Sequence, residues 1–228
     1  MAPNLHLFSS PGKEDIRDII EASRPYLEGK LDATVAYLPL ASLYVERWQE
    51  TTAESFKGLA RLETINAELM PQKDIEKILR DTSLVYIPGG NTFLLNHRLH
   101  VCGIVFYLRK RIQAGLPLVG FSAGAILCGP NILTSNDMNT VATSSFEGLS
   151  TTPFNFSPHY PLDNYGQTMK DEWLSDYHFF HDNPIVMMSD GAYVKVDGKK
   201  TTLVRGEAWI WRKDQEKEKL EESKLIAL

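Results

Sequence analysis

The chain has 228 residues, of which 43% are hydrophobic and 23% are charged. These values are typical of one globular domain and exclude disordered, collagen-like and coiled-coil classes. The formal net charge of −5, with no basic cluster, argues against nucleic acid as a partner.

The N-terminal segment lacks the positive region and apolar stretch of a signal peptide. No apolar run approaches the roughly 20 residues that span a bilayer. We therefore expect a cytoplasmic protein without membrane contact. Cys102 and Cys128 form no Cys-x-x-Cys pair, so we expect no disulfide framework, no metal site and no other cofactor.

Short apolar runs alternate with longer amphipathic segments in the first half of the chain. The pattern predicts strands at residues 5–8, 34–38, 62–65, 83–88 and 116–121. It predicts helices between them, at 13–27, 44–62, 71–80 and, with a break near 100–103, 91–114. Such alternation predicts a mostly parallel sheet with helices on both faces.

The second half of the chain is less regular. Residues 130–161 are rich in Ser, Thr, Asn and Pro, which predicts a long functional loop. A helix is expected over 166–180, followed by short strands, the last ones antiparallel, at 184–188, 192–196, 201–204 and 208–211. Residues 212–224 carry five basic and five acidic side chains and predict a solvated, frayed helical tail. With no repeat and no boundary, residues 1–228 are expected to form a single domain.

The sharpest local signal is the sequence Gly120-Phe121-Ser122-Ala123-Gly124, which lies between a predicted strand and a predicted helix. A serine at such a tight turn is exposed for nucleophilic attack, and its small neighbours prevent clashes. An ordinary glycine-rich turn is the alternative interpretation. The placement after a strand favours a catalytic serine.

A second signal, Gly89-Gly90-Asn91-Thr92, ends another predicted parallel strand, where ligands bind in open α/β sheets. We expect the amides of Gly90 and Ala123 to form an oxyanion hole, with Gly89 and Asn91 beside the substrate. A helix cap at Asn91 is compatible with this role. No P-loop or G-x-G-x-x-G sequence occurs, so nucleotide binding is not expected.

His159 is the strongest candidate for the base among the six histidines. It lies in Ser157-Pro158-His159-Tyr160-Pro161, where two prolines restrict the backbone. Asp137 and Asp190 are both candidates for the carboxylate that orients the imidazole. Each aspartate also has the alternative of a structural role in an Asx turn.

Four motifs occur together in the order and spacing found in peptidase E; these are Pro88–Phe93, Gly120–Ala125, Thr134–Met138 and Pro158–Tyr160. From its first strand to about Trp211, the chain resembles this aspartyl dipeptidase family of serine peptidases, which is related to cyanophycinases. The resemblance implies a class I glutamine amidotransferase-like, flavodoxin-like fold with three layers, a mostly parallel sheet and extra short antiparallel strands near the C-terminus. It also implies metal-free hydrolysis of dipeptides that begin with aspartate.

The resemblance implies that Ser122 is the nucleophile and His159 the base, and it leaves both Asp137 and Asp190 as candidates for the acid. The family's Gly-Glu-Thr-Arg-Glu segment, whose arginine is implied in holding the aspartyl carboxylate, corresponds here to residues 166–170. Gln167 and Met169 replace the glutamate and the arginine. A thioether carries neither charge nor donor, and Lys170 is expected on another helix face. Weak preference for aspartate is therefore expected.

The favoured function is hydrolysis of small peptides by a serine dipeptidase. Two alternatives stay open: a catalytically impaired homologue that acts as a binding or scaffold protein, and a small-molecule esterase or amidase. The short separation of Ser122 and His159 in the chain disfavours an α/β-hydrolase esterase. The sequence gives no natural substrate, and a homodimer is one arrangement that it allows.

Overall fold

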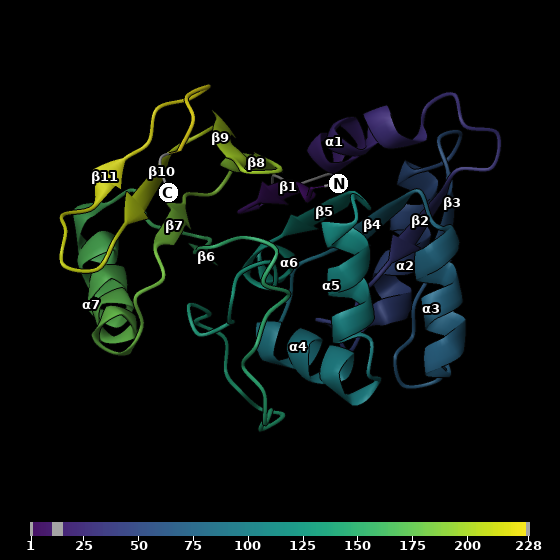
Figure 1. Ribbon diagram of the computed structural model, residues 1–228, viewed down its shortest axis with the longest axis horizontal. Helices are drawn as coiled ribbons and strands as arrows, with labels where there is room; N and C mark the ends of the chain where they lie inside the picture. The colour runs from purple at the N-terminus through teal and green to yellow at the C-terminus, as the bar shows by residue number, and fades with distance from the viewer. Residues whose placement is uncertain (1, 11–15, 227–228) are drawn as a thin grey trace.

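The computed structural model describes residues 2–10 and 16–226 and shows a seven-stranded sheet at the centre of the fold (Figure 1). Five neighbouring strands are parallel, in the order β3 (Arg61–Thr64), β2 (Thr34–Tyr37), β4 (Leu84–Ile87), β5 (Leu118–Phe121) and β1 (Asn4–Phe8). Antiparallel strands continue the sheet beyond β1, namely β8 (Tyr193–Asp197) and β9 (Lys200–Arg205). The predicted α/β class with a mostly parallel sheet is confirmed.

Helices cover both faces of this sheet. One core contains Leu84 and Tyr86 of β4 together with apolar side chains of α1 (Arg17–Leu27) and the residue after α2 (Val45–Ser55). The other core contains Val85 and Ile87 of β4 together with side chains of α3 (Gln72–Asp81), α4 (Thr92–Val101) and α5 (Val105–Gln113). Because alternate residues of β4 enter different cores, this central strand is buried and apolar along its whole length. Among the described residues, no helix is long and apolar enough to cross a membrane.

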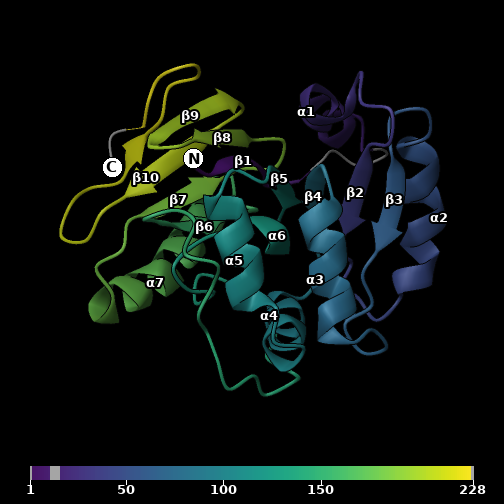
Figure 2. The same ribbon diagram turned by 45° about the vertical axis from the view of Figure 1, so that its right-hand side comes forward.

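A second sheet has four strands and lies beside the first (Figure 2). It contains β6 (Asn155–Ser157), β7 (Ile185–Met188), β10 (Ala208–Trp211) and β11 (Glu218–Lys219); only β6 and β7 are parallel. Helix α7 (Asn164–Phe180) packs on one face of this sheet through Leu174 and Tyr177. The other face contributes Phe156, Val186 and Ile210 to the main core. This shared core supports the predicted single domain, which stays a prediction.

Some predicted bounds differ from those in the structure. Helix α2 ends at Ser55 rather than at residue 62, because the chain turns through Gly58 at φ +80° before β3. Helix α1 begins at Arg17, and predicted helical residues 13–15 lie outside the described residues. The predicted break between α4 and α5 is confirmed and occurs at Gly103, with φ +72°. The polar segment 130–161 ends in a strand, β6, that the sequence did not predict.

The prediction of a frayed helical tail is wrong. Strand β11 pairs with β10, and the Leu220 amide donates to the Ala208 carbonyl at 2.8 Å. The tail returns to the first sheet, where Ile226 is buried and its amide donates to the Thr201 carbonyl. Pairing with an existing strand edge outweighs the helix propensity of Lys and Glu in this segment.

Candidate active site

Ser122 lies at a sharp turn between β5 and α6 (Ala123–Ile126). Its backbone has φ 50° and ψ −111°, a conformation that is rare outside glycine. The glycines around it are required by packing. A Cβ on Gly124 would lie 2.2 Å from the Ile87 carbonyl oxygen, and one on Gly120 would lie 3.0 Å from the Gly124 backbone. Close packing of α6 on β4 and β5 therefore forces the turn that presents the Ser122 side chain.

His159 follows β6 and brings its imidazole to Ser122. The distance from Ser122 Oγ to His159 Nε2 is 2.9 Å. His159 has φ +57°, and its amide donates a hydrogen bond of 2.8 Å to Ser9 Oγ. The structure thus joins two sites that the sequence identified separately, and the backbone that carries the imidazole is held in an unfavourable conformation.

Asp190 follows β7 and lies on the far side of the imidazole from Ser122. Its Oδ1 atom is 2.6 Å from His159 Nδ1, a short contact typical of hydrogen bonds to a carboxylate. Asp137 makes different contacts, since its Oδ2 accepts from the Thr92 amide at 2.7 Å and from the Ser135 hydroxyl at 2.9 Å. Of the two candidate acids, only Asp190 contacts His159.

The turn at Gly89 and Gly90 packs directly against the Ser122 turn. A Cβ on Gly89 would lie 2.5 Å from the Phe121 ring and 3.1 Å from Ser122 Cβ. Gly90 has φ +133°, and a Cβ there would lie 2.5 Å from the Ala41 carbonyl oxygen. Among the described residues, neither the Gly90 amide nor the Ala123 amide donates a backbone hydrogen bond outside regular structure. The Ala123 amide is the first of α6 and has no intrahelical acceptor, and the Gly90 amide lies in the turn before α4, so both can donate to a ligand.

Asn91 has the capping role that the sequence allowed. Its Oδ1 accepts from the Leu94 amide at 2.9 Å, and its Nδ2 donates to the Met138 carbonyl at 2.9 Å. These two hydrogen bonds fix the start of α4 against the loop that contains Asp137. Asn91 therefore holds the Gly89–Gly90 turn in place from its C-terminal side.

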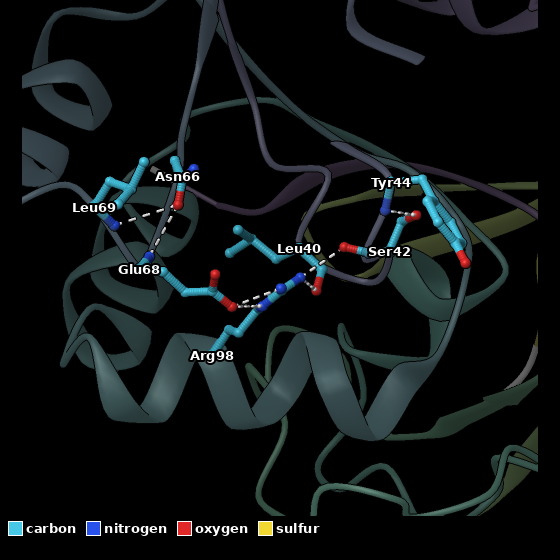
Figure 3. A network of polar contacts seen from close by, with 7 residues as sticks. All are labelled: Leu40, Ser42, Tyr44, Asn66, Glu68, Leu69 and Arg98. Atoms are coloured by element: carbon cyan, nitrogen blue, oxygen red, sulfur yellow. Dashed lines mark hydrogen bonds and ion pairs between the residues drawn. The ribbon is translucent and has the colours of Figure 1, made fainter. Parts of the chain in front are cut away.

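A buried arginine of α4, Arg98, binds the loop at Leu40 and Ser42 (Figure 3). Arg98 Nη1 donates to the carbonyls of Leu40 at 2.9 Å and Ser42 at 2.7 Å, and Nη2 lies 2.6 Å from Glu68 Oε1. Between these two carbonyls, the Ala41 carbonyl accepts from the Asn91 amide at 2.9 Å. Arg98 therefore fixes the loop that packs on Gly90, and its donors are occupied. No motif in the sequence pointed to this role.

The helix that follows His159 places its candidate specificity residues on different faces. Met169 is 37% exposed, whereas Lys170 is only 4% exposed. The Gln167 side chain donates from Nε2 to the Pro161 carbonyl at 3.0 Å. Burial lowers the pKa of Lys170 to about 8, and the nearby Asp137 carboxylate opposes this shift. Among the described residues Lys170 has no hydrogen bond or ion pair, and Asp137 is the charged group that acts on its ammonium.

Ser9 is a site residue that the sequence reasoning missed. It is fully buried after β1, accepts from the His159 amide, and donates from Oγ to the Met188 carbonyl at 3.1 Å. The only sequence signal is a polar residue directly after an apolar strand, at the edge where parallel strands end. Ser9 links the first sheet to the loop that carries His159.

Metal ligands do not gather in the parts of the chain that the structure describes, where no three His, Cys, Asp or Glu side chains form a cluster. Cys128 lies behind α6, 3.4 Å from the Gly124 carbonyl oxygen. Burial raises the pKa of its thiol to about 12, which keeps it protonated and unreactive. Ser122 is therefore the nucleophile that the geometry favours at this edge.

Comparison with known proteins finds relatives that are named as peptidases. A protein of Drosophila melanogaster named "Probable alpha-aspartyl dipeptidase" is 32% identical over 177 residues, which cover 75% of this chain and 72% of the relative. A protein of Shewanella amazonensis named "Peptidase E" is 30% identical over 210 residues, which cover 82% of this chain and 86% of the relative.

Solved structures agree with the sequence relatives. A candidate peptidase E from Listeria monocytogenes EGD-e superposes with a TM-score of 0.69 at 25% identity, covering 93% of this chain and 99% of the other. The sequence profile of peptidase family S51 matches residues 5–204, a span that includes nearly all of the first sheet, strands β6 and β7 of the second, and the Ser122, His159 and Asp190 contacts. The chain therefore belongs to peptidase family S51 and is a serine peptidase.

Proposed function

We propose that this peptidase hydrolyses dipeptides and other short peptides through an acyl-enzyme formed on Ser122. The observation that supports the proposal is a continuous chain of contacts: Ser122 Oγ to His159 Nε2 at 2.9 Å, and His159 Nδ1 to Asp190 Oδ1 at 2.6 Å. A hydroxyl, an imidazole and a carboxylate in this order are the parts that acyl transfer requires. The dipeptidase names of the relatives support a short substrate.

In this mechanism His159 Nε2 takes the Ser122 proton as Oγ attacks the scissile carbonyl. The imidazolium then gives this proton to the leaving amine, and the acyl group remains on Ser122. Water, deprotonated by His159, releases the acyl group and restores the hydroxyl. Asp190 keeps a proton on Nδ1, so that Nε2 is free to act as the base.

The Gly90 and Ala123 amides stabilise the negative oxygen that develops on the substrate carbonyl. Both belong to turns that pack against Ser122, and both are free of backbone partners among the described residues. Each such donor contributes on the order of 3 kcal/mol to the transition state in enzymes of this kind. Arg98 and Asn91 contribute indirectly by holding the Gly90 turn.

A serine-reactive fluorophosphonate tests this function without knowledge of the natural substrate. We expect one covalent adduct per chain, located on Ser122 by mass spectrometry, and slower labelling when a hydrolysed dipeptide is present. A natively folded protein that stays unlabelled, or that labels on another serine, contradicts the proposal and favours a binding or scaffold role. Labelling at Ser122 with hydrolysis of esters but of no peptide would indicate the esterase alternative.

For specificity, we propose that Lys170 supplies the cation that binds an acidic side chain of the substrate. Met169, at the arginine position of the motif, is partly exposed, while the neighbouring ammonium is buried near Asp137. Asp137 in turn contacts Thr92, two residues beyond Gly90. A buried ammonium without a partner costs stability, and a substrate carboxylate would relieve that cost. The name of the Drosophila relative supports an aspartyl substrate.

Exchange of Lys170 for methionine tests this specificity. We expect Lys170→Met to lower kcat/KM for Asp-Leu by roughly 10- to 100-fold, since a charge-assisted hydrogen bond is lost. Hydrolysis of Leu-Leu should change by less than about threefold. Equal effects on both dipeptides would contradict the proposal, as would wild-type preference for Leu-Leu. Met169→Ala is the control, because this neighbouring side chain carries no charge.

The pH dependence gives a second readout of Lys170. Its pKa of about 8 means that the ammonium is present below this pH and is lost above it. KM for Asp-Leu should therefore rise above pH 8, whereas KM for Asn-Leu should not rise in parallel. The comparison removes effects of the peptide's own amine, which titrates near the same pH. The predicted cytoplasmic location and homodimer stay predictions.

A further inference from the structure

The C-terminal hairpin lies outside the part of the chain that matches the family, which ends at residue 204. The hairpin consists of β10 and β11 and the residues between them, and it lies beside α7 in Figures 1 and 2. Its Trp211 Nε1 donates to the Gln215 carbonyl at 2.9 Å, which closes the connecting turn. This turn brings the next basic residue, Lys217, back toward the second sheet.

Lys217 joins a closed set of hydrogen bonds with Tyr160 and Asp171. Its Nζ lies 2.5 Å from Asp171 Oδ2 and 2.6 Å from the Tyr160 hydroxyl oxygen. The Tyr160 hydroxyl donates to Asp171 Oδ1 at 2.7 Å. The Lys217 and Asp171 side chains are only 28% and 26% exposed, so solvent screens this pair less than an open surface pair.

The Tyr160 ring is fixed by contacts of its own. The residue is 1% exposed, and its ring centroid lies 5.0 Å from that of Trp209 in β10. Lys217 Nζ also lies 5.3 Å from the centre of the Tyr160 ring, within the range of a cation–π contact. Burial and the Asp171 carboxylate raise the pKa of the phenol, so it keeps the proton that it donates. Tyr160 is thus fixed by α7 on one side and by the hairpin on the other.

Tyr160 directly follows His159, so its position determines where the imidazole lies. The Tyr160 amide donates to the Met188 carbonyl at 2.9 Å, and His159 has the unfavourable φ of +57°. A backbone conformation of this kind persists only where surrounding contacts hold it. Ser9 and Met188 hold the backbone of His159 and Tyr160, Gln167 Nε2 holds the Pro161 carbonyl, and the Tyr160 side chain adds a further anchor.

We propose that Lys217 is a positioning residue: together with Asp171 it fixes Tyr160, and through it the backbone that presents His159 to Ser122. This inference rests on the proposed role of His159 as the base. It assigns a function to a segment beyond the family match that charge patterning alone describes as a solvated tail. Lys217 itself touches no reacting atom.

The full-length Lys217→Met variant tests the proposal, with Lys219→Met as the matched control. Lys219 lies two residues further along the hairpin, in β11; it pairs with Glu207 and approaches Trp209, and no contact joins it to Tyr160. We expect Lys217→Met to lower kcat and the rate of Ser122 phosphonylation by about tenfold, since small displacements of a catalytic group have large effects on rate. KM should change by less than about twofold, and Lys217→Arg should recover most of the loss.

Tyr160→Phe provides a second variant, which keeps the ring and removes only the hydroxyl. We expect a similar loss of kcat, and little further loss when it is combined with Lys217→Met, because both changes break the same link. A folded Lys217→Met protein with wild-type kcat and wild-type labelling rate overturns the proposal. So does a loss that Lys219→Met reproduces, because this would indicate a general effect on the hairpin.

An NMR measurement separates this inference from the proposed function. The Cε1–H signal of His159, assigned with His159→Gln, should shift or broaden in Lys217→Met and remain unchanged in Lys219→Met. An unchanged signal in both variants refutes the positioning role even if Ser122 is catalytic. An unlabelled Ser122 in the wild-type protein refutes the catalytic assignment, while the NMR signal still decides whether Lys217 positions the ring.

Discussion

Replacement of Ser122 by alanine is expected to lower kcat/KM by roughly 10⁴- to 10⁶-fold on every peptide that the wild-type protein cleaves. No neighbouring hydroxyl can take over, since Ser9 is fully buried and its Oγ is engaged by the His159 amide and the Met188 carbonyl. The residual rate would come from the oxyanion hole and substrate binding alone. The measurement is initial-rate hydrolysis of a dipeptide, with circular dichroism to verify folding.

Ser144→Ala is the matched control for this variant. Ser144 is exposed and lies in the polar segment before β6, so its loss should leave the rate within about twofold. Retention of more than a few per cent of wild-type kcat/KM by Ser122→Ala would show that another group attacks the peptide. The assignment of the nucleophile would then be wrong, whatever the geometry of the turn.

The second large effect is expected at the carboxylate that orients His159. Asp190→Asn should lower kcat by roughly 10²- to 10⁴-fold, because an amide at this position favours the tautomer with the proton on Nε2. The Asp190 side chain is 69% exposed, so water can partly replace its hydrogen bond to His159. We therefore expect a loss nearer to roughly 10²-fold than to 10⁴-fold. Initial rates measured with Leu-Leu isolate this effect from any contribution of Lys170.

Asp137→Asn is the natural comparison, since both aspartates were candidates for the same role. Its carboxylate accepts from Thr92 and Ser135 instead, so we expect a loss of about 1 kcal/mol in the free energy of unfolding and less than a tenfold change in kcat. The reverse outcome, an inactive Asp137→Asn and an active Asp190→Asn, would exchange the two assignments. Urea titration and rate measurement on the same preparations decide between them.

Local patterns predicted much of the first sheet. Apart from the edge strand β3, its parallel strands are mostly buried, so they form short apolar runs that stand out between amphipathic helices. In the second sheet, β7 and β10 were predicted at 184–188 and 208–211, whereas β6 and β11 gave no such signal. Strand β6 has three residues and pairs with β7 across a 17-residue helix, while β11 consists of Glu and Lys. Both strands exist because a partner edge is available, which is a property of the folded chain rather than of the segment.

In the candidate site, too, some residues could be predicted from local patterns and others could not. Ser122 and His159 could be predicted because glycines and prolines beside them identify positions where the backbone turns sharply or is restricted. The choice between Asp137 and Asp190 depends on which loop reaches the imidazole, and no local pattern contains that information. Ser9, Arg98 and Lys217 are ordinary polar residues in sequence. Their importance comes only from the burial and the partners that the fold gives them.

The helix after His159 shows what a local argument leaves open. Met169, at the arginine position of the motif, predicts a site without a cation and a weak preference for aspartate, and this expectation stays a prediction. In the structure Met169 is the more exposed of the two neighbours and Lys170 is the buried one. The periodicity of a helix separates adjacent residues onto different faces, but it does not reveal which face turns inward when both have apolar stems.

The three side chains of the proposed catalytic site are divided between two sheets. Ser122 follows a strand of the seven-stranded sheet, whereas His159 and Asp190 follow strands of the four-stranded sheet. Ser9 follows β1 of the first sheet and connects it to the second, because its side chain forms one hydrogen bond with the His159 amide and one with the Met188 carbonyl. If one sheet shifted slightly relative to the other, the Ser122 hydroxyl would move away from the His159 imidazole, while the hydrogen bonds between strands within each sheet would remain. The rate of catalysis is therefore a more sensitive measure of how the two sheets are aligned than any measurement of secondary structure.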